Sequence, residues 1–149
     1  MVIGHWSLVM GGGGWLLEGV MPVQRFEELR VYQMAEELAD AVWSMVAEWE
    51  TFAKETLGKQ IVRSADSVGA NISEGFGRGT YNDNKRFVRM ARGSLYETRH
   101  WLRRAFKRSL INDDQVTHIK PLIQDLAPML NAYLNAIGPT DNQSPNTND

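Results

Sequence analysis

The chain has 149 residues, of which 43% are apolar and 23% are charged, and its formal net charge is −2. This length and composition are typical of one soluble globular domain. Because the sequence contains no cysteine, disulfides, thiolate zinc sites and cysteine nucleophiles are excluded, which is consistent with a reducing, cytoplasmic compartment.

Both ends of the chain are predicted to lie outside the folded domain. The N-terminal stretch MVIGHWSLVMGGGGWLLEGV has apolar runs interrupted by glycines, no basic n-region and no continuous apolar run of about 18 residues, so it predicts neither a signal peptide nor a membrane span. Residues 1–21 are therefore either upstream of the natural start or a loosely packed extension, with a tether to a membrane or to a partner as the alternative. Residues 138–149, GPTDNQSPNTND, contain no large apolar residue and predict a disordered tail.

Between these ends, residues 22–137 predict an all-α domain. Apolar residues recur at three- and four-residue steps, which is the helical period, in four blocks at 22–54, 55–74, 82–109 and 113–137. Four such helices with short connections favour an antiparallel up-and-down four-helix bundle.

The segments between the last three blocks carry helix stop and start signals. GFGRGTYND from residue 75 supplies glycines that end a helix and capping residues near Asn82, and INDDQ from residue 111 supplies the next cap. Pro121 fits near the first turn of the last helix, whereas Pro128 should kink it.

Positive charge is concentrated in the third block. Residues 58–108 have twelve basic and four acidic side chains, whereas residues 21–57 have three and eight, and residues 109–149 have one and five. At 100° per residue, six cations of this helix fall on one side, with Tyr96 and His100 close by and apolar residues opposite. This basic stripe consists of Lys85, Arg89, Arg92, Arg99, Arg103 and Lys107.

Two interpretations of the basic stripe stay open. It could pair with acidic side chains of the first and last helices, within the chain or between subunits, although exposed ion pairs stabilise by only about 0–1 kcal/mol each. The candidate acids are Glu27, Glu28, Glu36, Glu37, Asp113 and Asp114. Alternatively, the stripe could follow a phosphate backbone, where aligned cations give salt-dependent and largely sequence-independent binding. Other anionic partners are a third possibility.

Three stretches carry a resemblance to a known family: FEELRVYQMAEELA from residue 26, QIVRSADSVGANISEGFGRGTYND from residue 60 and FVRMARGSLYET from residue 87. Together they resemble the four-helix-bundle family named for 23S ribosomal RNA intervening sequences. The matching positions are Phe26, Leu29, Val31, Ala35, Gln60, Arg63, Ala65, Ser67, Asn71, Ile72, Glu74, Gly75, Gly77, Arg78, Ala91, Gly93, Ser94, Leu95 and Glu97.

The resemblance implies a bacterial homo-oligomer, a pentameric ring, with no catalytic activity and no cofactor. It also implies nucleic acid as a partner. A related branch of the family is the accessory protein of diversity-generating retroelements, which acts beside a reverse transcriptase, so a reverse transcriptase is a further candidate partner. No membrane partner is expected.

The family motif residues also have purely structural interpretations. Small residues on the second and third helices, which are Ser64, Ser67, Gly69, Ala70, Gly93 and Ser94, would let a neighbouring helix approach closely. Asn71 and Glu74 need hydrogen-bond partners if they are buried, and Arg63, Arg78 or the start of the third helix could provide them. EGFGR is not a nucleotide-binding loop, because it follows a helix and lacks the GK[ST] ending.

No catalytic or metal site is predicted. The three histidines have no metal-binding spacing, and a nuclease built from Glu74, Arg78 and Glu97 is a weaker alternative than packing roles for these residues. We therefore predict a non-enzymatic homo-oligomer that binds RNA or an RNA–DNA intermediate through the basic stripe. The alternative is a protein-interaction scaffold that does not touch nucleic acid. Self-association is also favoured by a surplus of large apolar residues, namely Met34, Trp43, Met45, Trp49, Met90 and Trp101.

Overall fold

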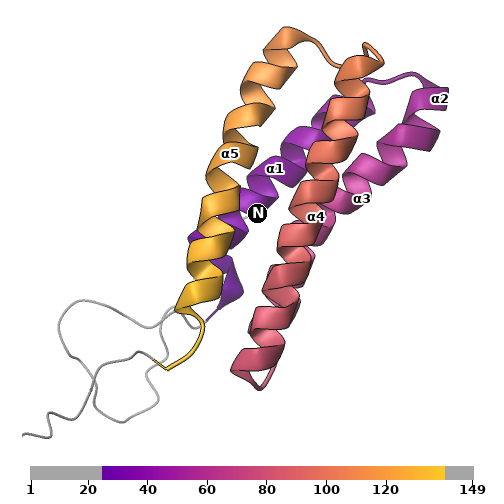
Figure 1. Ribbon diagram of the computed structural model, residues 1–149. Helices are drawn as coiled ribbons and strands as arrows, with labels where there is room; N and C mark the ends of the chain where they lie inside the picture. The colour runs from indigo at the N-terminus through magenta and orange to yellow at the C-terminus, as the bar shows by residue number, and fades with distance from the viewer. Residues whose placement is uncertain (1–24, 140–149) are drawn as a thin grey trace, which may run out of the picture.

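The computed structural model describes residues 25–139, so the predicted N-terminal extension and nearly all of the predicted tail lie outside the described residues. The described chain is helical and contains no strand within this range (Figure 1). Its elements are η1 (Phe26–Glu28), α1 (Arg30–Ala47), α2 (Thr51–Ala53), the π-helical η2 (Lys54–Gly58), α3 (Lys59–Phe76), α4 (Tyr81–Lys107) and α5 (Asp113–Ala136). The prediction of four main helices is confirmed.

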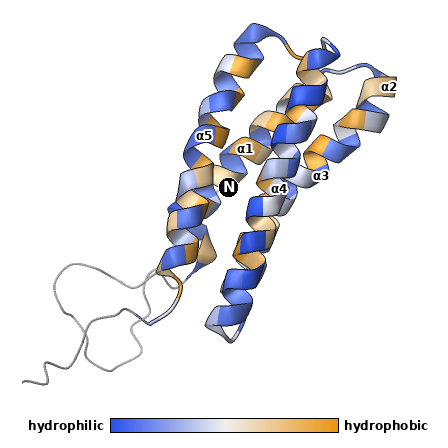
Figure 2. Cartoon of the chain, in the orientation of Figure 1, coloured by the Kyte–Doolittle hydropathy of each residue, from blue (hydrophilic) through white to orange (hydrophobic). Residues whose placement is uncertain are grey.

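The four long helices pack so that each has two neighbours. α1 contacts α3 and α5, and α4 contacts the same two helices from the other side. Hydrophilic and hydrophobic residues alternate along every helix (Figure 2). Each helix therefore presents an apolar side to the others and a polar side to solvent.

The predicted boundary between the first two helices is wrong. α1 ends at Ala47, and the chain is extended at Glu50, with φ −65° and ψ 156°, before α2 begins. Trp49 is only 8% exposed, and its backbone N–H donates to the carbonyl of Val46 at 3.0 Å. Burial of the indole thus ends the helix at a place where no glycine or proline signals a turn. α2, η2 and α3 follow one another without a gap.

The starts of α4 and α5 are fixed by side-chain caps. Thr80, and not Asn82 as predicted, caps α4, and its hydroxyl accepts a hydrogen bond from the backbone N–H of Asp83 at 3.1 Å. The predicted cap of α5 is confirmed, because the side chains of Asn112 and Gln115 form a capping box.

The two prolines do not interrupt α5. Pro121 lies well inside the helix and not in its first turn, and the helix also continues through Pro128. Both residues are on the exposed side, so the backbone carbonyls that lose their N–H partners can be hydrated.

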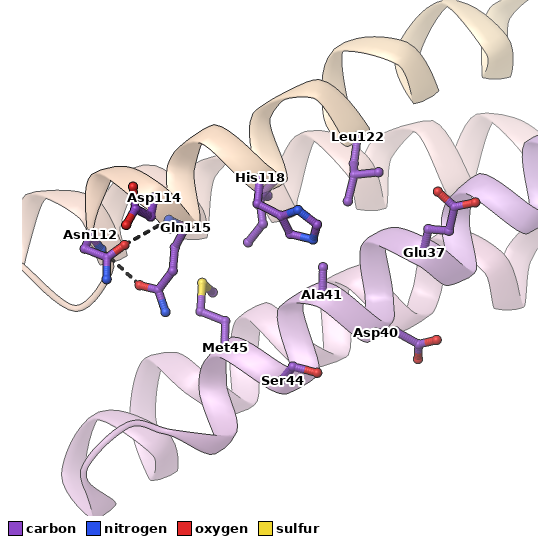
Figure 3. A pocket seen from close by; sticks show the side chains of 11 residues that line it. Glu37, Asp40, Ala41, Ser44, Met45, Asn112, Asp114, Gln115, His118 and Leu122 are labelled. Carbon is purple, nitrogen blue, oxygen red and sulfur yellow. Dashed lines mark hydrogen bonds between the residues drawn. The ribbon is translucent and has the colours of Figure 1, made fainter.

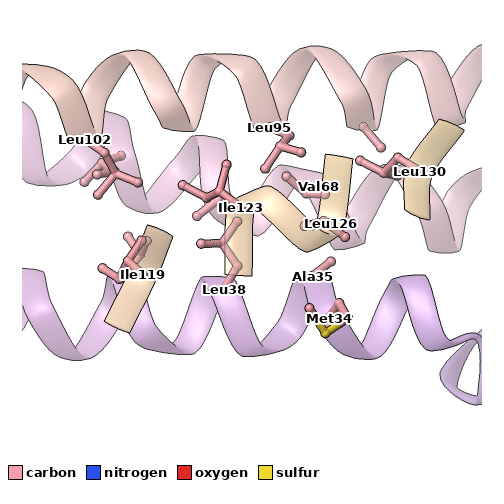
Figure 4. Packing of buried hydrophobic residues seen from close by; sticks show 14 of the residues in the cluster. Met34, Ala35, Leu38, Val68, Leu95, Leu102, Ile119, Ile123, Leu126 and Leu130 are labelled. Carbon is pink, nitrogen blue, oxygen red and sulfur yellow. The ribbon is translucent and has the colours of Figure 1, made fainter. Parts of the chain in front are cut away.

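The core runs along the centre of the bundle and takes residues from all four long helices (Figure 4). Leu38 on α1, Val68 on α3, Leu95 on α4 and Leu126 on α5 are all fully enclosed. One buried hydrogen bond joins α3 to α4: the hydroxyl of Thr98 donates to the hydroxyl of Ser64 at 3.0 Å. The predicted apolar stripe of the second helix is confirmed by the burial of Leu57, Ile61, Ala65, Val68 and Ile72.

The predicted surplus of large apolar residues is smaller than expected. Met34, Met45 and Trp49 are buried in the core of the single chain. Of the six large apolar residues predicted to favour self-association, only Trp43, which is 63% exposed, and Met90, which is 47% exposed, lie on the surface. Trp101 is half-buried. Within residues 25–139, no helix has the combined length and apolar character needed to cross a bilayer.

Two family glycines offer a matched stability test. A Cβ on Gly75 would lie 2.8 Å from both Phe87 Cβ and Asn84 Oδ1, whereas a Cβ on Gly93 would meet nothing within 4 Å. We expect Gly75→Ala to lower the free energy of unfolding by about 1–3 kcal/mol through overpacking. Gly93→Ala should raise it by up to about 1 kcal/mol, because alanine favours the helix. Urea denaturation followed by circular dichroism measures both, and a Gly75→Ala protein as stable as wild type would contradict the packing described here.

Candidate nucleic-acid interface

α4 separates apolar and cationic side chains onto opposite faces. Seven of its residues are buried, namely Phe87, Val88, Ala91, Leu95, Thr98, Leu102 and Ala105. Of the basic stripe, Arg89, Arg99, Arg103 and Lys107 are exposed, and Lys85 and Arg92 are half-buried. The structure therefore brings all six predicted residues to the outer side of one helix.

The half-buried members of the stripe reach toward α5. The guanidinium of Arg92 donates to Asn131 Oδ1 at 3.1 Å. Lys85 Nζ lies 4.0 Å from the position that a Cβ on Gly138 would take, just beyond the end of α5. These contacts place the stripe along the junction of α4 and α5.

The six cations make no ion pair with an acidic side chain of residues 25–139. The ion pairs of the described chain join Arg25 to Glu28, Arg30 to Glu37, Lys59 to Glu55, Arg78 to Glu74 and Arg86 to Asp83. The expected pairing of the stripe with acids of the first and last helices is therefore not formed within the chain.

The acids proposed as partners have other contacts or lie elsewhere. Glu36 accepts a hydrogen bond from the hydroxyl of Tyr32 at 3.0 Å, and Glu37 faces Arg30 at 3.5 Å. Asp113 and Asp114 lie in the first turn of α5, where negative charge stabilises a helix N-terminus.

An open groove adjoins the stripe between α4 and α5. Its volume is about 670 Å³, and Arg99, Arg103 and Lys120 line it together with Gln124. The remaining lining residues are apolar, namely Leu102, Phe106, Ile111, Val116, Ile119, Ile123 and Ala127. No acidic side chain of the described residues lines this groove, so its rim is uniformly cationic.

The other side of α5 has the opposite charge. A groove of about 730 Å³ between α1 and α5 is lined by Glu37, Asp40 and Asp114, with His118 beside them (Figure 3). A further acid, Asp66 on α3, has a carboxyl pKa raised by burial and by the nearby charge of Asp40. Glu37 and Asp114 stand out in the sequence as acids of the first and last helices, but only the packing of α1 against α5 brings them into one groove.

Several family motif residues fix the turn between α3 and α4. Arg78 forms an ion pair with Glu74 at 2.7 Å, and its guanidinium carbon lies 4.6 Å from the centroid of the Phe87 ring. Arg86 lies against the same ring at 4.8 Å. Glu74 is exposed, so the condition under which it would need a partner is not met, but Arg78, one of the partners considered for it, does pair with it. Gly75 lets α4 approach α3 because no side chain would fit there.

Other motif residues have roles that differ from the prediction. Asn71 donates to the carbonyl of Ser67 at 2.8 Å, and no arginine of residues 25–139 donates to its amide oxygen. Gly93 faces open space, so it admits no neighbouring helix within the chain, and Ser94 donates to the carbonyl of Met90 at 3.1 Å. Gly77 caps the C-terminus of α3, and Glu97 accepts a hydrogen bond from the indole of Trp101 at 3.2 Å.

The structure brings together no metal-binding cluster in the part of the chain that it describes. No group of three or more acidic or histidine side chains in residues 25–139 has the geometry to hold an ion. Glu74 and Glu97, the carboxylates of the alternative nuclease site, are held by Arg78 and Trp101 respectively.

Comparison with protein families decides where the chain belongs. The model of the 23S rRNA-intervening sequence protein family matches residues 27–132, which is more than half of the chain. The chain belongs to this family. The match to the 23S rRNA-intervening sequence proteins includes α1, α3, α4 and most of α5.

A solved structure has the same fold as this member of the family. It is a protein of unknown function from the S23 ribosomal protein family of Bacteroides thetaiotaomicron VPI-5482. The two chains are 22% identical with a TM-score of 0.63, and the likeness covers 71% of this chain and 96% of the other. No curated protein matches the chain. The relation to retroelement accessory proteins stays a prediction.

Proposed function

We propose that the protein is a non-enzymatic, self-associating helical bundle that binds nucleic acid, RNA or an RNA–DNA intermediate, through the basic stripe on α4. The observation that carries the proposal is the set of six aligned cations with no acidic partner within residues 25–139. When unneutralised cations in a row contact phosphates, they release the counterions condensed on the nucleic acid, and this release is the main driving force of non-specific nucleic-acid binding.

The geometry of the stripe suits an extended polyanion. Lys85 and Lys107 are separated by about 33 Å along the helix, since each residue rises by about 1.5 Å. The row continues onto α5 through Lys120, which lines the same groove as Arg99 and Arg103. A small anion would use one or two of these cations, whereas a phosphate backbone can use all of them.

Self-association would repeat the stripe and add avidity. We propose an antiparallel up-and-down bundle that closes into a ring of identical subunits in the cytoplasm. Trp43, which is 63% exposed, supports an interface because it lines a groove of about 690 Å³ between α1 and α3 with Val46 and Val62. Modest phosphate contacts from each subunit would then sum to a useful affinity.

A second candidate function is docking of a protein with an acidic surface, such as a reverse transcriptase. The cationic rim and apolar floor of the groove between α4 and α5 favour it, because an acidic amphipathic helix would fit both features. The two candidates differ in whether isolated nucleic acid binds at all.

Charge removal on α4 tests the proposed function. Replacing Arg89, Arg92, Arg99 and Arg103 with Gln removes four charges and keeps helix propensity. We expect affinity for RNA to fall strongly, and the slope of log affinity against log salt to become shallower by about 2.8–3.6 units, since each of the four phosphate contacts contributes about 0.7–0.9. Fluorescence anisotropy across a salt series measures both quantities.

A matched variant controls for the change in net charge. Arg30, Lys54, Lys59 and Arg63 lie on α1, η2 and α3, away from the stripe, and their replacement with Gln removes the same charge. Because Lys54, Lys59 and Arg63 line the same groove as Trp43, light scattering first verifies that this variant keeps the wild-type assembly. The control should then bind RNA nearly as well as wild type. Wild-type protein without salt-dependent binding to any nucleic acid would overturn the proposal, and a stripe variant that dissociates into monomers would assign the stripe to the subunit interface.

The exposed indole of Trp43 tests self-association. We expect light scattering to show an oligomer for wild type and a smaller species for Trp43→Glu, because a charge would then have to be buried in the interface. The circular dichroism spectrum should be unchanged, since the side chain is outside the core. A wild-type monomer at micromolar concentration would contradict self-association.

A further inference from the structure

α4 exposes three aromatic side chains among its cations. Tyr81 is 58% exposed, Tyr96 is 56% exposed and Phe106 is 47% exposed. With Lys85 at 0° on a wheel of 100° per residue, these rings lie at about −40°, 20° and −60°, inside or next to the sector of the basic stripe. On the outer face of α4, aromatic side chains are therefore interspersed among the basic ones.

Two of the three rings lie against a member of the stripe or line its groove. The guanidinium carbon of Arg99 lies 5.3 Å from the centroid of the Tyr96 ring. Phe106 lines the groove between α4 and α5 together with Arg99 and Arg103. By contrast, Phe87 on the same helix is buried and Trp101 is half-buried. The bundle core therefore accepts aromatic side chains from α4, but the three exposed rings point away from it.

This arrangement differs from an ordinary solvated helix face. Single exposed apolar residues are common on protein surfaces and need no explanation. Here, however, three rings share one sector with six cations, and no acidic side chain of the described residues lines the adjoining groove. A surface built for salt bridges alone uses the charges but has no particular use for exposed aromatic faces.

We propose that the α4 face binds single-stranded nucleic acid, with bases stacked on Tyr96 and Phe106 and the intervening phosphates contacted by Arg99 and Arg103. This inference rests on the proposed function and names the form of nucleic acid that the same surface selects. Tyr96 and Phe106 are separated by about 15 Å along the helix. That separation corresponds to roughly four stacked nucleotides at about 3.4 Å each.

Single strands suit the surface better than duplexes. In a duplex the bases are already stacked on one another, so exposed rings on a protein gain nothing from them, and only the cations would contribute. In a single strand every base has a free face, and stacking on aromatic side chains is sequence-tolerant and strong. The loops of a structured RNA present such bases.

The test compares ring removal with charge removal in the full-length protein. Tyr96→Leu and Phe106→Leu keep the apolar character and the helix but remove the stacking surface. Fluorescence anisotropy would measure the affinity of each protein for labelled oligouridylate and for an RNA duplex of the same length, at several salt concentrations. Phe52→Leu on α2 is the matched control, because Phe52 is 82% exposed and lies apart from the stripe.

We expect wild type to prefer the single strand, and each α4 variant to lose about tenfold in affinity for it. Duplex affinity and the salt slope should stay the same, because no charge is removed, and Phe52→Leu should bind as wild type does. Light scattering and thermal melting would verify that each variant keeps the wild-type assembly and fold.

The outcomes separate this inference from the proposed function. Salt-dependent binding that is equal for single strand and duplex, or unaffected by loss of both rings, would overturn the stacking inference and leave the proposed function standing. Absence of binding to either probe at low salt would overturn both.

Discussion

The burial of one face of α4 is the constraint on which the other features of the molecule depend. Ala91, Leu95 and Ala105 are completely enclosed, and Thr98 donates a hydrogen bond to Ser64 of α3 from within the core. These contacts fix the rotation of α4 about its own axis. A different rotation would bury several unpaired guanidinium groups, at a cost of several kcal/mol each, so the basic stripe can only face outward.

The charges of the chain are separated in space as well as in sequence. Cations lie along α4 and its junction with α5, whereas Glu37, Asp40 and Asp114 lie at the junction of α5 with α1. α5 is thus the boundary between a cationic and an acidic surface. A near-neutral protein with this distribution can hold a polyanion on one side, and its acidic side disfavours a second contact with the same strand.

The helical period predicted most of the fold because the core of a bundle repeats that period. The five apolar positions of the second block and the outward direction of the α4 cations both follow from spacing alone. The end of α1 could not be found in this way, because burial of Trp49 determines it and no local breaker residue is present. Gly93 was misassigned for a related reason, since the approach of another helix depends on how helices meet in three dimensions. Asn71 was misassigned for a different reason, because its side chain is satisfied within its own helix by the carbonyl of Ser67.

The site could be predicted only as a list of cations on one helix. The groove beside the basic stripe includes Lys120 and Gln124 from α5. The cations of the stripe lack ion pairs because the acids of α1 and α5 lie elsewhere, as Glu37 does beside Arg30. Neither property is visible in a helical wheel of α4. The helical wheel already places Tyr96 beside the stripe, whereas the place of Phe106 in the groove required the packing of α4 against α5.

Chemical footprinting of the lysines provides the most direct test of whether this face holds nucleic acid. The chain has five lysines, of which Lys85, Lys107 and Lys120 line or flank the basic stripe, and Lys54 and Lys59 lie on η2 and α3. Acetylation of the intact protein followed by mass spectrometry would measure the reactivity of each lysine with and without RNA at low salt. We expect RNA to protect the first three and to leave Lys54 and Lys59 unchanged. Equal protection of all five, or protection of Lys54 and Lys59 alone, would contradict the assignment of nucleic-acid binding to α4.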